Sequence, residues 1–161
     1  MTALKVNGRT LEVGSRPDRT LADALRNDLG LIGVRVSCSE GECGSCTVLV
    51  DGKPTTSCLM LVNQAEGREI TTIEGIGTPD DLHPIQEAFV EEQGFQCAFC
   101  TPGFILSAKA FLAENPNPTA DEASVAMSGN ICRCGAYPYI VRSVLKAAEK
   151  LRANAAGQPA E

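Results

Sequence analysis

Eight cysteines are the residues of this 161-residue chain whose type and spacing could do chemistry, and they fall into two sets of four. The first set has the spacing Cys-x4-Cys-x2-Cys-x11-Cys: Cys38, Cys43, Cys46 and Cys58. This is a spacing with which four thiolates hold a 2Fe–2S cluster. Gly41 and Gly44 would let the loop turn tightly around it, since glycine tolerates positive φ and close backbone approach. Zinc or disulfides remain alternatives, although zinc ligands more often come as two CxxC-like pairs.

The second set consists of two close pairs that are far apart in the sequence: Cys97, Cys100, Cys132 and Cys134. Each pair falls at a predicted junction between helices, and two such junctions can lie at the same end of a helical bundle. Four thiolates would then converge from two loops. The Cys-Arg-Cys pair is too tight for the usual zinc spacing and too strained for an internal disulfide. Taken alone, this second set leaves the identity of its metal open.

The expected compartment and the net charge of the chain narrow the chemistry of the cysteines and the classes of partner. The N-terminus enters a strand-like pattern at once, without the charged and apolar segments of a secretory signal, so we expect a cytoplasmic protein. In a reducing cytoplasm, such cysteines more often bind metal or do redox chemistry than form disulfides. The formal net charge is −6, and no apolar run approaches the ~20 residues that span a bilayer. We therefore expect no nucleic-acid binding and no membrane span.

The elements that must position the first set are strands and turns. Asn7-Gly8 and Asp51-Gly52 each lie between two strand-like segments, and both residues of such a turn take positive φ, which predicts two β-hairpins. Between the hairpins, Thr20 is the expected N-cap of an amphipathic helix. A short strand over 69–73 follows. Two hairpins around one helix predict a small α+β domain over residues 1–76.

The second half of the chain has helical patterns. Glycine, proline and aspartate accumulate just before it, so residues 77–83 are predicted to be a linker. Apolar periodicity and capping signals then predict four helices, which begin near Pro84, Thr101, Thr119 and Tyr137. Four short helices favour a four-helix bundle over 84–153, with a flexible tail over 154–161. His83 is interpreted as a linker or capping residue and not as a catalytic one.

Three separated stretches carry a resemblance to a known family: residues 38–49 (CSEGECGSCTVL), 96–103 (QCAFCTPG) and 129–134 (GNICRC). In this order they resemble the small iron–sulfur subunit of the xanthine oxidase family of molybdenum hydroxylases. The resemblance implies an α+β fold with an N-terminal plant-type ferredoxin-like β-grasp domain followed by a C-terminal four-helix bundle. The patterns predict the same two halves independently. Ser37 and Ala98 stand where that family usually has glycine.

The resemblance also implies cofactors and residue roles. An outer 2Fe–2S cluster would be held by Cys38, Cys43, Cys46 and Cys58. An inner 2Fe–2S cluster, nearest the molybdenum, would be held by Cys97, Cys100, Cys132 and Cys134. Gln96 and Cys134 match positions that contact the molybdopterin cofactor in the family. Electrons would pass singly from the molybdenum site through the inner cluster to the outer one and then to an acceptor.

Partners follow from the same resemblance. A large subunit would hold the molybdopterin cofactor and the substrate, and a medium subunit would usually hold FAD, which another acceptor replaces in some relatives. Because the substrate pocket lies on another chain, nothing here selects among aldehydes, N-heteroaromatics, purines, carbon monoxide and aromatic thioesters. Two rival hypotheses are a zinc-stabilised interaction module, which would be colourless, and a free-standing ferredoxin, which would not need the helical half.

Overall fold

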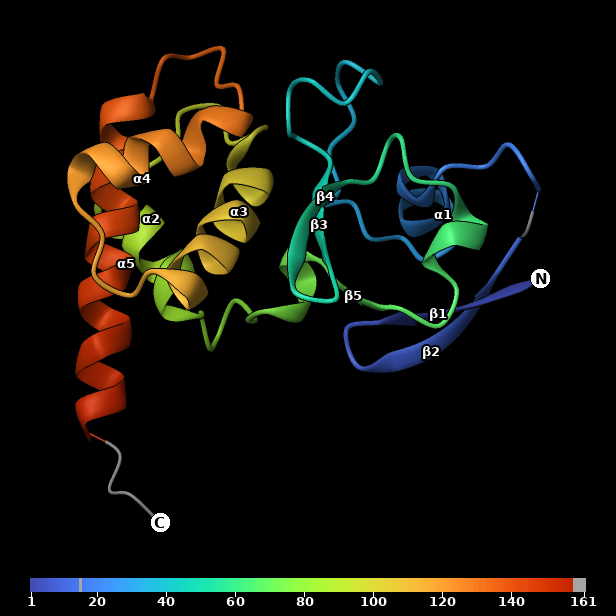
Figure 1. The fold of residues 1–161 in the computed structure, drawn as a ribbon, viewed down its shortest axis with the longest axis horizontal. Coiled ribbons are helices and arrows are strands. Elements are labelled where there is room, and N and C mark those ends of the chain that lie inside the picture. The colour runs from blue at the N-terminus through green and yellow to red at the C-terminus, as the bar shows by residue number, and fades with distance from the viewer. Residues whose placement is uncertain (15, 158–161) are drawn as a thin grey trace.

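The computed structural model describes residues 1–14 and 16–157, and it shows a half built on a β-sheet beside a helical half (Figure 1). The first half contains β1 (Thr2–Val6), β2 (Arg9–Val13), α1 (Leu21–Asn27), β3 (Thr47–Val50), β4 (Lys53–Thr56), the 3₁₀ turn η1 (Val62–Ala65) and β5 (Glu69–Thr71). A second 3₁₀ turn, η2 (Ile73–Gly75), leads to the other half. The helical half contains α2 (Pro84–Glu91), α3 (Thr101–Glu114), α4 (Ala120–Ala126), the 3₁₀ turn η3 (Met127–Gly129) and α5 (Tyr137–Gly157).

The five strands form one sheet in the order β2-β1-β5-β3-β4. Neighbouring strands are antiparallel except β1 and β5, which run parallel. Both predicted hairpins are confirmed, and their turns have the expected backbone: φ is 51° and 74° at Asn7 and Gly8, and 50° and 77° at Asp51 and Gly52. These two turns thereby fix the register of the sheet.

The core of the first half lies between the sheet and α1. Its fully buried side chains alternate along the strands and line one face of the helix, as burial of one face of each element requires; they include Leu4, Val6, Leu21, Leu25, Val48 and Ile70. Two of the eight cysteines, Cys46 and Cys58, belong to this core. The first cysteine set is therefore anchored on one side in a packed interior.

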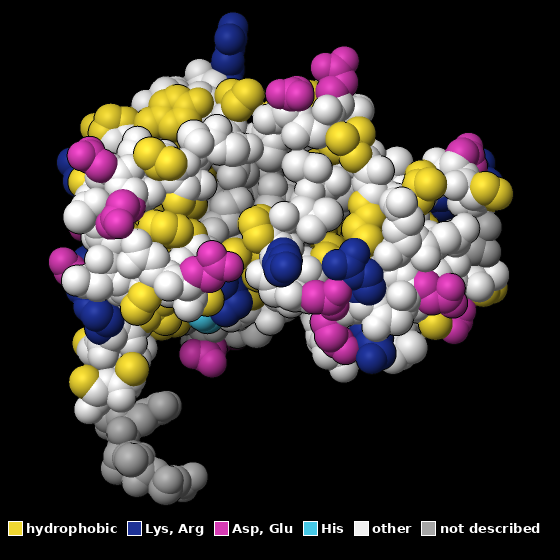
Figure 2. All heavy atoms as spheres, viewed as in Figure 1, with side chains coloured by type: hydrophobic (Ala, Val, Ile, Leu, Met, Phe, Trp, Pro, Cys, Tyr) yellow, Lys and Arg dark blue, Asp and Glu magenta, His cyan; other side chains and the backbone are white. Residues whose placement is uncertain are grey.

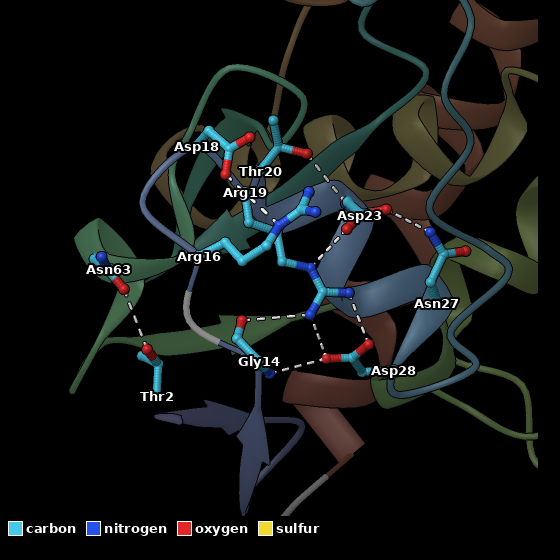
Figure 3. A network of polar contacts seen from close by, with 10 residues as sticks. All are labelled: Thr2, Gly14, Arg16, Asp18, Arg19, Thr20, Asp23, Asn27, Asp28 and Asn63. Atoms are coloured by element: carbon cyan, nitrogen blue, oxygen red, sulfur yellow. Dashed lines mark hydrogen bonds and ion pairs between the residues drawn. The ribbon is translucent and has the colours of Figure 1, made fainter.

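The start of α1 is held by its cap and by an arginine network. The Thr20 hydroxyl accepts the N–H of Asp23 at 3.2 Å, so the predicted N-cap is confirmed. Figure 3 shows Arg19 reaching along the helix to two carboxylates. Its Nε donates to Asp23 at 2.6 Å, and its Nη1 and Nη2 donate to the two oxygens of Asp28 at 2.5 and 2.7 Å. Asp28 also accepts the N–H of Gly14, which ties the end of β2 to the end of α1.

The helical half has its own core, formed by one apolar face of each helix; its buried members include Ile85, Phe89, Phe104, Ile140 and Val144. His83 caps α2, because its Nδ1 accepts the N–H of Ile85 at 3.2 Å. The α5 helix begins at Tyr137 and continues four residues beyond the expected end at 153, since alanines there favour the helix. The rest of the predicted tail, 158–161, lies outside the described residues.

The two halves pack directly against each other. The α3 helix contacts β3 and β4 of the sheet and the turn η2, and Figure 1 shows it as the helix nearest the sheet. The predicted mixed class, with a sheet half followed by a helical half, is confirmed at this level. Within the described part of the chain, no helix is long and apolar enough to cross a bilayer.

Candidate iron–sulfur sites

The first cysteine loop turns tightly between α1 and β3. Ser39, Gly41 and Gly44 have φ of 58°, 79° and 69°, in the left-handed region that a glycine adopts without strain. A Cβ on Gly41 would also lie 2.4 Å from the side chain of Leu59. The glycines that the sequence marked are therefore required both by the backbone conformation and by the space around the loop.

The thiols of the first set come together as two pairs. Cys38 and Cys43 form a hydrogen-bonded thiol pair at the half-buried edge of the loop. Cys46 and Cys58 form a second pair inside the core. The hydroxyl and the N–H of Ser57 both donate to the carbonyl of Cys46, which fixes the return of the chain to the loop. The structure thus brings the fourth predicted ligand, Cys58, to Cys46.

The thiols of the second set also come together, from the loop before α3 and from the loop before α5. Cys97 pairs with Cys134 on the surface, and Cys100 pairs with Cys132 in the interior. The charge of Cys97 also acts on Cys100, and that of Cys132 acts on Cys134, so the two pairs lie near each other. Ala98 has φ of 59°, which explains why glycine is expected at this position by resemblance.

Each set contains one thiol that the backbone prepares for negative charge. The N–H groups of Glu40 and Cys43 both donate to Cys38 Sγ at 3.4 Å, and they lower the pKa of the Cys38 thiol to about 6. The N–H of Phe99 lowers the pKa of the Cys97 thiol in the same way. Such N–H donors also stabilise the sulfur ligands of a cluster.

The interior thiol pairs have the opposite tendency. Burial raises the pKa of the Cys46 thiol to about 11 and that of Cys100 to about 12. A thiol in such surroundings ionises only when a positive charge offsets the loss of water, and metal ligation supplies that charge. The donor chemistry of both sets therefore fits a cation bound between a more accessible thiol pair and a buried one.

The arrangement in pairs bears on which metal would fit. Among the described residues, no three His, Cys, Asp or Glu side chains surround a single point as the ligands of one metal ion do. A zinc ion draws four thiolates into one tetrahedron, whereas each iron of a 2Fe–2S cluster takes two thiolates. Two thiol pairs per set fit the dinuclear cluster better than they fit a zinc ion.

Tyr137, which the sequence marked only as the start of a helix and as a possible interface residue, also holds the second loop in place. The hydroxyl of Tyr137 accepts the N–H of Cys132 at 2.9 Å, and its ring stands edge-on to Phe104 with centroids 6.4 Å apart. The N–H of Ala136 donates to Cys132 Sγ at 3.5 Å. A tyrosine at the start of α5 gave no signal of this role in the sequence, since the bond depends on how the loop folds back.

The two cysteine loops touch each other across the boundary between the halves. The N–H of Ile131 donates to the carbonyl of Cys43 at 2.9 Å. The buried amide of Asn130 donates from Nδ2 to the carbonyl of Gly44 at 2.9 Å and accepts the Ser107 hydroxyl at 2.8 Å. Because Ile131 adjoins Cys132, a ligand of each predicted set lies at this junction. The sequence predicted both loops, but not this contact between them.

Gln96, the predicted cofactor contact, lies on the surface beside Cys97. Its amide makes no hydrogen bond with any described residue, and Cys134, the other predicted contact, is exposed as well. The surrounding surface carries large apolar side chains, each more than a third exposed: Phe99, Ile131, Tyr137 and Tyr139. Figure 2 shows hydrophobic side chains gathered along the upper edge of the helical half, where α5 begins in Figure 1.

Comparison with known proteins gives matches over both halves. Residues 4–71 match the family described as 2Fe-2S iron-sulfur cluster binding domain, and residues 72–145 match the [2Fe-2S] binding domain. The aldehyde oxidoreductase iron-sulfur-binding subunit PaoA of Escherichia coli O157:H7 is 49% identical over 92% of this chain and 72% of its own length. The nicotinate dehydrogenase small FeS subunit of Eubacterium barkeri is 46% identical over 91% and 94% of the two chains.

Among solved structures, quinoline 2-oxidoreductase from Pseudomonas putida 86 contains a chain with the same fold. The TM-score is 0.90 at 42% sequence identity, and the match covers 94% of this chain and 95% of that one. The similarity therefore extends over the sheet half, the helical half and both cysteine sets, and over nearly the whole of a separate chain in the related protein.

Proposed function

The chain belongs to the small iron–sulfur subunits of the xanthine oxidase family of molybdenum hydroxylases, and we propose how its residues serve electron transfer in such a complex. Its task is to hold two 2Fe–2S clusters between a molybdopterin site on a large subunit and an acceptor. Each bound cluster accepts and releases one electron at a time. The substrate is oxidised on the large subunit, so this chain binds no substrate. Relatives named for aldehyde, nicotinate and quinoline match this chain at 49%, 46% and 42% identity, and each match covers more than nine-tenths of it.

The observation that carries this proposal is the pairing of thiols in two sets whose loops are bonded to each other. The Ile131–Cys43 hydrogen bond and the buried Asn130 amide hold the loops at a fixed separation. Electron transfer between centres slows steeply with distance, so a rigid, short spacing is what a relay requires. A zinc-stabilised interaction module would need neither two adjoining sites nor thiols in pairs.

We assign the ligands accordingly. The outer cluster takes the set from the sheet half: Cys38, Cys43, Cys46 and Cys58. The inner cluster takes the set from the helical half: Cys97, Cys100, Cys132 and Cys134. The buried pair of each set anchors its cluster in the core, and the loops keep water from the buried sulfurs.

We place the surface that carries Gln96 and Cys134, beside the inner cluster, against the large subunit. Gln96 has a free amide that can donate to and accept from a pterin ring, and the Cys134 thiol lies exposed on the same side. Exposed aromatic side chains such as Phe99 and Tyr137 surround them. Apolar groups of this kind are typical of the buried centre of a protein interface. The electron acceptor, FAD in a medium subunit or another carrier, then lies on the side of the outer cluster.

Two finer features belong to the same proposal. The sheet half has the β-grasp arrangement of plant-type ferredoxins, and α2 to α5 form a four-helix bundle whose one end carries the inner cluster. The complex works in the cytoplasm. The unbroken core of the helical half and the cysteine chemistry support these assignments.

Rapid-freeze electron paramagnetic resonance on the intact complex tests the order of the clusters. Cys43→Ala should remove the outer signal while substrate still reduces the inner cluster within the first turnover. Gln96→Ala should keep both clusters and all eight cysteines, yet weaken molybdopterin retention or slow reduction of the inner cluster. If Cys43→Ala stops reduction of the inner cluster while Gln96→Ala behaves as wild type, the assignment of inner and outer is reversed.

A further inference from the structure

A pocket of about 290 Å³ lies between the two halves, next to the loop that carries Cys97 and Cys100. Its floor is apolar and comes from buried side chains of α2 and α3, among them Phe89 and Ile105. Arg35, from the sheet half, closes one side of it, and Thr101 at the start of α3 closes another. Its size is at the lower end of pockets that hold small organic groups, which range over ~300–1,000 Å³.

The only two buried side-chain polar atoms without a partner among the described residues both belong to lining residues of this pocket. They are Nε of Arg35 and the hydroxyl oxygen of Thr101. Buried donors are nearly always satisfied in a folded protein, so two orphans at one pocket point to a missing acceptor. That both unpartnered atoms belong to lining residues is an observation separate from the shape of the pocket.

Arg35 is also without a counter-charge. Its guanidinium makes no ion pair or hydrogen bond with any described residue, and it lies over the face of Phe99, 5.7 Å from the ring centroid. No aspartate or glutamate lines the pocket. Glu74, in the adjoining hollow, is engaged by the N–H of Gly33 and the hydroxyl of Thr72. In a chain of net charge −6, an arginine with no ion pair among the described residues is available to an external anion.

The pocket continues into a groove. A second hollow of about 500 Å³ shares Ile73, Leu82 and Gln86 with it and follows the linker toward Pro79. Exposed apolar side chains, Val90 and Phe95, stand at the rim of the first pocket. An apolar groove that ends in an arginine and a hydroxyl fits an extended peptide segment whose acidic side chain reaches the polar end.

We propose that this interdomain groove receives an acidic, apolar-flanked segment of the large partner subunit, whose carboxylate binds the Arg35 guanidinium and the Thr101 hydroxyl. This rests on the proposed function, which places the adjacent Cys97–Cys100 loop against that subunit. The charge of the pocket selects a carboxylate, and its continuity with the inner-cluster end selects the large subunit over a free metabolite or a second copy. The contact would lock the two halves together where the inner cluster is bound.

Carbodiimide cross-linking of the purified complex tests the proposal directly. In Arg35→Lys, the new amine should form an amide with a carboxylate of the large subunit, with loss of water, and peptide mass spectrometry would locate the bond. Arg9→Lys is the matched control, because Arg9 is exposed on β2 at the far edge of the sheet. The control should give no cross-link to the large subunit.

Affinity gives the second readout. Arg35→Gln should raise the dissociation constant of the large subunit about tenfold or more, because it leaves the partner's carboxylate unpaired; Thr101→Val should raise it less. Arg9→Gln, with the same charge change, should leave it unaltered, and iron content should stay at the wild-type value in all three.

The outcomes separate the two proposals. A stable wild-type complex in which Arg35→Lys cross-links only within its own chain or to a second copy, or in which Arg35→Gln binds like Arg9→Gln, overturns the groove assignment alone. A wild-type chain with both clusters that does not associate with a large subunit overturns the proposed function and the groove together.

Discussion

Replacing Asn130 with alanine should loosen the junction between the two cysteine loops. Asn130 is 4% exposed and is the side chain that bonds the helical half to the loop of the first set. The substitution removes its bond to the Gly44 carbonyl and its bond from the Ser107 hydroxyl. No cysteine is altered, so the change acts on the contact between the halves and not on the ligands.

The expected loss of stability depends on the hydrogen bonds that Gly44 and Ser107 still make in the variant. The Gly44 carbonyl still accepts the N–H and the hydroxyl of Thr47, at 3.1 and 2.7 Å, so it is not left unsatisfied. Each lost hydrogen bond then contributes about 1 kcal/mol, or about 2 kcal/mol together. For a domain of this size that lowers the melting temperature by about 4–8 °C. Ser107→Ala, which removes only one of the two bonds, should cause about half of that drop.

The assay is thermal melting of the cluster-loaded protein, followed both by circular dichroism and by loss of visible absorbance. Asn117→Ala is the matched control, since Asn117 is exposed and its side chain makes no hydrogen bond with any described residue. An Asn130→Ala protein that melts within a degree of this control would refute the reasoning that the amide holds the halves together.

Three further changes test other parts of the structure. Gly44→Ala should abolish assembly of the outer cluster, because φ is 69° and the added Cβ would lie 2.5 Å from Asn130 Nδ2, whereas Gly129→Ala, which meets nothing within 4 Å, should assemble normally; iron content of the two proteins decides this. Tyr137→Phe keeps the edge-on ring contact with Phe104 but leaves the N–H of Cys132 without its acceptor, so the inner cluster should be lost faster in air, as its paramagnetic signal would show. Hydrogen bonds from Arg19, and then from the Gly14 N–H, hold the pKa of Asp28 below its usual value. These bonds stabilise the folded protein fully above the unfolded pKa of about 3.9, and this stabilisation is lost as the pH falls through the lower pKa of the folded state. Denaturant unfolding should therefore show Asp28→Asn less stable than wild type by about 1 kcal/mol at pH 6, with the difference shrinking toward pH 3; a constant difference would contradict the ion-pair account.

The parts of the fold that the sequence predicted are those with a local physical cause. The pairs Asn7-Gly8 and Asp51-Gly52 predicted the hairpins because few other residue pairs place two consecutive residues at positive φ. Thr20 and Thr119 predicted the starts of two helices because a threonine hydroxyl can accept a first-turn backbone N–H that has no acceptor within the helix. The single turns η1 and η2 were not predicted, since one turn of 3₁₀ helix is too short to show a period.

The sequence predicted which cysteines belong to each set, but not which residues of the two loops contact each other. Spacing alone identified the loop around Cys38 and Cys43, because three ligands on one short loop constrain each other. That Cys97 faces Cys134, or that Ile131 bonds to Cys43, depends on how helices far apart in the chain pack. Such single long-range contacts leave no pattern in the residues that make them. Arg35 likewise reads as an ordinary surface residue until the pocket beside it is known.

The central claim, that this chain holds two 2Fe–2S clusters on two sets of four thiolates, is tested most directly by counting iron and sulfide in variants of one complex. Wild type should contain about four iron and about four sulfide per chain, and reduction should give two paramagnetic signals. Cys43→Ala and Cys132→Ala should each keep about half of the iron and should lose different signals. Stoichiometric zinc with negligible sulfide, or the loss of the same signal from both variants, would contradict the claim.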